Sequence, residues 1–189
     1  MPFIVHPTDL SPTSEAAFLH ALKLGLAAKA HLSLVHLHDV RSKEEPHKDD
    51  FPRVRDTLIR WGLLSEGATR AEVGDKLGLY LSKGMYLAGD PEAALTRLLR
   101  RSNTEFMVLS TRGLRGLRRI FDRSFSEELT RHAQIPTLIV PQDAIGFVDI
   151  DGGVRLANIL APIAEVPPCV PAIRAAVRIC RLLGQKDRL

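Results

Sequence analysis

Short apolar runs alternate with amphipathic segments along the first 141 residues of the chain. Each run predicts a buried strand and each amphipathic segment, with its apolar residues three or four apart, predicts a helix. The strands are expected at 3–9, 31–38, 85–89, 106–111 and 136–141, and the helices at 11–30, 50–64, 90–103 and 124–134. Residues 69–84 predict a short helix followed by a turn. The alternation predicts an α/β fold, a doubly wound five-stranded parallel sheet with helices on both faces.

The starts of two helices carry their own signals. Ser11 followed by Pro12, and Asp90 followed by Pro91, place a capping side chain before a proline at the first helical position. These pairs fix where the first helix and the fourth helix are expected to begin.

Polar side chains stand where the first and fourth strands end. Asp9 follows the first strand, and Ser110 lies at the end of the fourth, where the stretch "STRGLRGLRRIFDRS" begins. Ligands of doubly wound sheets bind beyond the carboxyl ends of the strands. Asp9 and this stretch are therefore expected to border one crevice.

The charge of the chain is concentrated in that stretch. Residues 112–123 contain five arginines and one aspartate, which account for the whole net charge of +4. Such a local basic patch favours a small anionic ligand or a partner surface over a long nucleic acid. A solvated arginine-rich loop is the simpler alternative.

Composition and the amino terminus bear on location. The chain has 45% hydrophobic and 25% charged residues, no apolar run of membrane-spanning length, and a start that lacks the layout of a signal peptide. We expect a cytoplasmic protein that is not in a membrane. Cys169 and Cys180 lie too far apart along one predicted helix to form a disulfide within it.

The chain resembles the universal stress protein family, and the specific signature lies in the stretch that begins at Ser110. Nucleotide-binding members of that family carry glycine, two residues, glycine, nine residues, and then glycine followed by serine or threonine. Gly113 matches the second glycine and Ser124 the terminal hydroxyl, whereas Ser110 and Arg123 replace the first and third glycines. The resemblance covers residues 1–141 and implies the family's fold, ATP or another adenine nucleotide as ligand, and Asp9 beside the adenine.

The two departures leave three outcomes open. A side chain at Ser110 or Arg123 can push the phosphates out, but the Arg123 guanidinium can also bind an anion as a fork. The crevice is therefore expected to bind ATP in the family's manner, to bind an anion or nucleotide more weakly, or to bind no nucleotide. The expected contact residues are Asp9, Ser110, Arg112, Gly113, Arg115, Arg123 and Ser124.

Catalysis and metal binding have weaker support. Ser124 lacks a nucleophile-elbow motif and, with Glu127 three residues on, is typical of a helix cap. His6, His36 and His38 stand on two neighbouring predicted strands, but no accompanying ligand motif makes them a metal site. We expect a protein that senses a ligand, with hydrolysis of ATP as a weaker third hypothesis because no residue is an evident base or metal ligand for phosphoryl transfer.

The end of the chain repeats its beginning. After an expected linker at 142–156, residues 157–189 match the start of the chain at a constant offset of 155, so that Ile159 corresponds to Ile4 and Pro162 to Pro7. This predicts the first strand and helix of a truncated second domain, in which Ala164 takes the place of Asp9. We expect residues 157–183 to be ordered by docking, the strand at a sheet edge across a dimer and the helix over apolar surface.

Two functions follow as hypotheses. The first is a universal stress protein that responds to a nucleotide or other small anion. The second is a dimeric interaction protein without a nucleotide, in which the apolar strand at 136–141 pairs with its mate in a homodimer.

Overall fold

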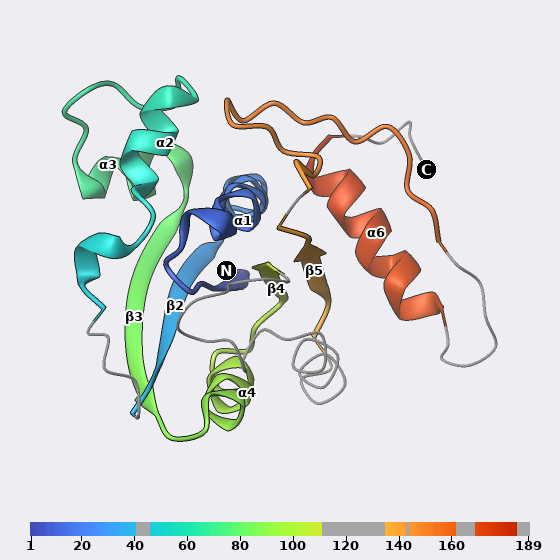
Figure 1. The fold of residues 1–189 in the computed structure, drawn as a ribbon. Coiled ribbons are helices and arrows are strands. Elements are labelled where there is room, and N and C mark those ends of the chain that lie inside the picture. Colours follow the sequence, from blue (N-terminus) through green and yellow to red (C-terminus); the bar gives the residue numbers. More distant parts are fainter. Residues whose placement is uncertain (41–45, 111–134, 143, 162–168, 185–189) are drawn as a thin grey trace.

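Five parallel strands form the centre of the molecule (Figure 1). The computed structural model describes residues 1–40, 46–110, 135–142, 144–161 and 169–184. The strand order is β3-β2-β1-β4-β5. The strands are β1 (Phe3–Pro7), β2 (His31–Asp39), β3 (Tyr80–Ala88), β4 (Phe106–Ser110) and β5 (Thr137–Val140). This order confirms the predicted doubly wound α/β fold, with its crossovers on both sides of β1.

Helices cover both faces of the sheet. One face packs on α1 (Glu15–Ala28), α2 (Val54–Arg60) and α3 (Arg70–Leu77), and the other on α4 (Pro91–Arg101). Two short 3-10 turns, η1 (Pro12–Ser14) and η2 (Lys48–Asp50), precede α1 and α2. Alternate residues of the central strands enter the two cores, as the period of two requires: Ile4 faces α1, and Val5 faces α4.

The strand β3 corrects the sequence-based prediction. The predicted short helix is α3: a capping box at Thr69 and Glu72 starts it, and Gly78 ends it with a φ of +65°. The chain then enters β3 at Tyr80, five residues before the predicted strand. The prediction of a turn was wrong because Ser82 and Lys83 interrupt the apolar pattern, which the outer strand of a sheet tolerates.

The segment after β5 is an ordered part of the fold and not merely a connector. Val148 and Val154 form an antiparallel bridge, and Val148 is 1% exposed. His20 on α1 is fully buried beneath this turn: its Nε2 accepts hydrogen bonds from the backbone N–H groups of Phe147 (2.9 Å) and Val148 (3.2 Å). The turn at 146–154 is thus docked on the helix face of the sheet.

The last described helix, α6 (Val170–Leu182), lies beside β5 on the side of α1 (Figure 1). Its bounds reproduce those of α1 at the offset of 155 to within one residue. Ala175, Ile179 and Leu183 pack against the core, and Arg178 forms an ion pair with Glu105. The expected cover over apolar surface is present, although within the same chain.

The predicted strand of the repeat is not formed in its described part. Residues 157–161 have no secondary structure within this single chain, and the expected pairing of the strand across a dimer stays a prediction. Their backbone pairs with no strand of the sheet, and Leu160 is 94% exposed. Cys169 and Cys180 are free thiols, as their spacing required. None of the described helices is long and apolar enough to cross a membrane.

Candidate ligand-binding site

The carboxyl ends of β1 and β4 lie next to each other at the middle of the sheet. The two strands pair directly, with Ile4 opposite Phe106 and Val5 opposite Met107. Further along, the Nδ1–H of His6 donates to the carbonyl of Val108 over 2.8 Å. Beyond β1, the N–H of Thr8 donates to the carbonyl of Val35 on β2 (2.8 Å). These bonds fix the loop that follows β1 between two strands.

Asp9 is held in a tight turn at this edge. Its Oδ1 accepts from the N–H (3.0 Å) and the hydroxyl (2.7 Å) of Ser11. Leu10 between them has a φ of +64°, a left-handed conformation that costs a residue with a Cβ about 1 kcal/mol or more. Ser11 therefore uses its hydroxyl on Asp9, and not as the predicted helix cap. This local arrangement orients the carboxylate of Asp9 rigidly.

The other oxygen of Asp9 is buried without a partner. Asp9 Oδ2 and the hydroxyl oxygen of Ser110 are inaccessible to solvent and make no hydrogen bond with any of the described residues. Buried polar atoms are almost always satisfied, so an unsatisfied one calls for a cause such as a missing ligand. Two such atoms, beyond β1 and at the end of β4, mark this edge as the candidate site.

Gln142 joins them from β5. Ser110 lies opposite Val140 in the sheet, and Gln142 comes two residues after Val140, so its side chain also belongs to the carboxyl edge. Its Oε1 is likewise buried and unpaired. The sequence prediction missed Gln142, because a lone glutamine after a strand carries no motif; only its register in the sheet identifies it.

Two neutral histidines flank the turn. Burial lowers the pKa of His6 to about 4, against the smaller opposing effects of its bond to Val108 and the charge of Asp9. Burial also lowers the pKa of His36, whose ring nitrogen Nδ1 donates to the carbonyl of Thr8 (2.9 Å). The turn therefore lies between two imidazoles that are uncharged at neutral pH.

The histidines form no metal centre with other side chains. His36 and His38 share a face of β2 with ring centres 6.3 Å apart. Across the described ranges, no group of three or more histidine, cysteine, aspartate or glutamate side chains is arranged to hold a metal ion. What the site offers chemically is two acceptors, the free oxygens of Asp9 and Gln142, and the Ser110 hydroxyl, which can accept or donate.

The structure thus brings together two of the predicted contact residues, Asp9 and Ser110. The other predicted contacts lie outside the described residues: Arg112, Gly113, Arg115, Arg123 and Ser124. The helix predicted at 124–134 also lies outside them. Ser110 is the last described residue before these predicted contacts, at the carboxyl edge of the sheet. Their contact with a ligand stays a prediction.

Comparison with protein families gives one match. The model of the universal stress protein family matches residues 3–141, which includes the whole sheet, Asp9 and Ser110. No curated protein sequence matches the chain significantly.

Comparison with solved structures finds several proteins that are described as universal stress proteins. The universal stress protein UspA from Lactobacillus plantarum is 20% identical, with 74% of this chain and 97% of that chain covered and a TM-score of 0.49. A universal stress protein in complex with cAMP is 17% identical, with 75% and 98% covered and a TM-score of 0.48. A family protein from Arabidopsis thaliana with AMP bound is 17% identical, with 76% and 94% covered and a TM-score of 0.43.

Proposed function

Because the chain belongs to the universal stress protein family over residues 3–141, we propose that it is a cytoplasmic stress protein that binds an adenine nucleotide or another small anion as a signal. The ligand occupies the crevice at the carboxyl ends of β1 and β4, and it is bound without turnover. The observation that carries this proposal is the pair of buried, unpaired oxygens on Asp9 and Ser110.

The polarity of the site orients the ligand. Asp9 Oδ2 is a charged acceptor, so it suits an amino or hydroxyl group and repels a phosphate. The arginine-rich stretch begins at the other border, after Ser110. The base or sugar therefore lies against Asp9, and the anionic end lies toward Arg112, Gly113, Arg115, Arg123 and Ser124.

A thermal-shift titration with ATP and magnesium tests this proposal. A ligand that binds only the native state at 100 times its Kd adds about 2.7 kcal/mol to the free energy of unfolding. Asp9→Ala should remove the shift in melting temperature, whereas Asp75→Ala, the same change on an exposed position of α3, should keep it. No shift for the unaltered chain with ATP, ADP, AMP or cAMP would reject an adenine nucleotide.

Arg123→Gly then separates two roles of the degenerate loop. It restores the family's third glycine and removes a cation. Tighter ATP binding by this variant means that the side chain obstructs the phosphates, and weaker binding means that the guanidinium holds the anion. Equal binding by Arg123→Gly and by Gly113→Val would show that the loop does not contact the ligand.

A homodimer without a nucleotide is the second candidate function, and one observation favours it. β5 is the outer strand of the sheet, pairs only with β4 in the described part of the chain, and exposes Ile139 by 39%. An apolar outer strand is protected when a second copy pairs with it. A dimer that shows no nucleotide-dependent shift would support this function over the first.

A further inference from the structure

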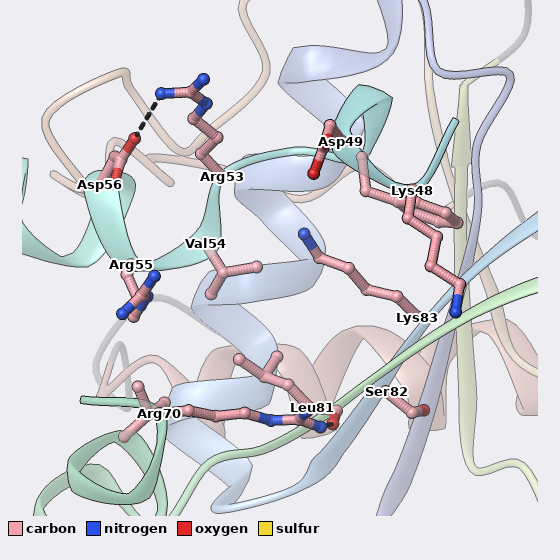
Figure 2. A pocket seen from close by; sticks show the side chains of 12 residues that line it. Lys48, Asp49, Arg53, Val54, Arg55, Asp56, Arg70, Leu81, Ser82 and Lys83 are labelled. Carbon is pink, nitrogen blue, oxygen red and sulfur yellow. Dashed lines mark hydrogen bonds and ion pairs between the residues drawn. The ribbon is translucent and has the colours of Figure 1, made fainter. Parts of the chain in front are cut away.

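A second, basic pocket lies against the outer strand β3 (Figure 2). It is a cavity of about 850 Å³ between η2, α2, α3 and β3, within the size range of small-molecule sites. Phe51, Val54, Val73 and Leu81 form its apolar wall. Neither Asp9 nor Ser110 is among the residues that line it, although Arg53 and Asp56 also border a neighbouring hollow that contains Leu10 and Ser11.

Cations from four elements border this pocket. Lys48 comes from η2, Arg53 and Arg55 from the start of α2, Arg70 from α3 and Lys83 from β3. Only Asp49 and Asp56 oppose them. Five positive side chains against two negative ones give the cavity a net positive charge, although the described chain as a whole is not dominated by basic residues.

Most of these cations have no carboxylate partner among the described residues. Arg53 pairs with Asp56 at 3.6 Å, but among the described residues no carboxylate lies within ion-pair distance of the other four. Arg55 and Arg70 each donate one N–H to a backbone carbonyl, of Ala68 (3.2 Å) and Leu81 (2.9 Å). Those bonds hold the guanidinium groups in place and leave further donors free for an anion.

Lys83 is the centre of this arrangement. It is on the helix-covered face of β3, and Figure 2 shows its amine pointing into the space between η2 and α2. The amine lies 5.7 Å from the centre of the Phe51 ring. Desolvation lowers the pKa of this lysine, with the charge of Asp49 opposing. An anion in the pocket would offset the free-energy cost of desolvating the charged amine.

We propose that this pocket binds a small phosphomonoester with an apolar or aromatic body, as a second ligand site of the protein. The doubly charged phosphate lies against Lys83, Arg55 and Arg70, and the body packs on Phe51 and Val73. A dianion fits because four cations there lack a carboxylate partner. The site does not depend on the nucleotide crevice, and its ligand does not touch Asp9.

Calorimetric titration of the full chain with phenyl phosphate tests the proposal. Lys83→Met should lower the affinity at least tenfold, and so should Arg70→Gln. Lys76→Met makes the same charge change on α3 outside the pocket and should leave the affinity within twofold. Asp9→Ala should also leave it unchanged, which separates this site from the nucleotide site. Raising the salt concentration should weaken binding.

Chemical-shift mapping on the unaltered chain makes the test independent of how well the variants fold. Phenyl phosphate should shift the backbone amides of residues 53–55, 70 and 81–83. No binding at millimolar phenyl phosphate, equal binding by Lys83→Met, or shifts confined to residues 8–11 and 110 would each overturn the proposal. In those cases Lys83 serves only as a charge that protects the outer strand from pairing with another chain.

Discussion

The contact between His20 and the turn at 146–154 gives a prediction whose size can be worked from the structure. The Nδ1–H of His20 donates to the carbonyl of Ala16 (2.7 Å), and its Nε2 accepts from the N–H groups of Phe147 and Val148. The ring also meets Phe147 edge-on at 4.4 Å. These bonds require the neutral imidazole with its proton on Nδ1.

Replacing His20 by leucine leaves two backbone N–H groups without an acceptor. A buried, unsatisfied donor costs about 1–3 kcal/mol. Val148 is buried whereas Phe147 is half-buried, so solvent relieves part of the cost for one of them. We therefore expect His20→Leu to lower the free energy of unfolding by about 2–4 kcal/mol. His20→Gln places an amide oxygen where Nε2 stood and should lose about half as much.

The assay is urea denaturation at pH 7.5 and again at pH 5.5. Burial lowers the pKa of His20 in the folded chain, so below pH 6.5 the unfolded chain takes up a proton that the folded chain refuses. The contribution of His20 to the free energy of unfolding is thus fully present above pH 6.5. It is lost as the pH falls, by up to about 1.4 kcal/mol per pH unit for one histidine. His20→Leu should show a shallower loss. A leucine variant as stable as the unaltered chain, or no more affected than His20→Gln, would refute the contact as described.

Three further predictions concern the sheet and its edges. Because burial lowers the pKa of His6 to about 4, this residue should cost about 3 kcal/mol of stability between pH 6.5 and 4, and the pH dependence of urea denaturation should be correspondingly shallower in His6→Asn. Deleting residues 150–189 removes α6 and should lower the melting temperature or change the mass in solution; an unchanged temperature and mass would show that the tail is not docked. Ile139→Lys on β5 should turn the proposed homodimer into a monomer in sedimentation at micromolar concentration, and a variant that still sediments as a dimer would exclude β5 as the interface.

The central strands and the helices beside them could be predicted because the local pattern of apolar and polar residues indicates which of their residues are buried. β1 and β4 are apolar on both faces, as strands covered on both sides must be. β3 was predicted too short because an outer strand with Ser82 and Lys83 needs no continuous apolar pattern. Its length is dictated by pairing with β2, which no local window contains.

The residues of the candidate site likewise divide into those that could be predicted from the sequence and those that could not. Asp9 and Ser110 were predicted because the carboxyl ends of parallel strands are known places for ligands. Gln142 and His20 were not, since their significance comes from partners or neighbours far along the chain: His20 meets residues 127 and 128 positions away. A histidine inside an apolar helix face gives no local sign of such a contact.

The most direct test of the central proposal is a titration of the isotope-labelled chain with ATP and magnesium, followed by the backbone amide shifts. A ligand at the carboxyl ends of β1 and β4 should shift the amides of residues 8–11, of Ser110 and of Gln142, with the Asp9→Ala variant losing the response. Absence of shifts at saturating ATP, or shifts at β3 and α2 with none at Asp9, would contradict the proposed nucleotide site.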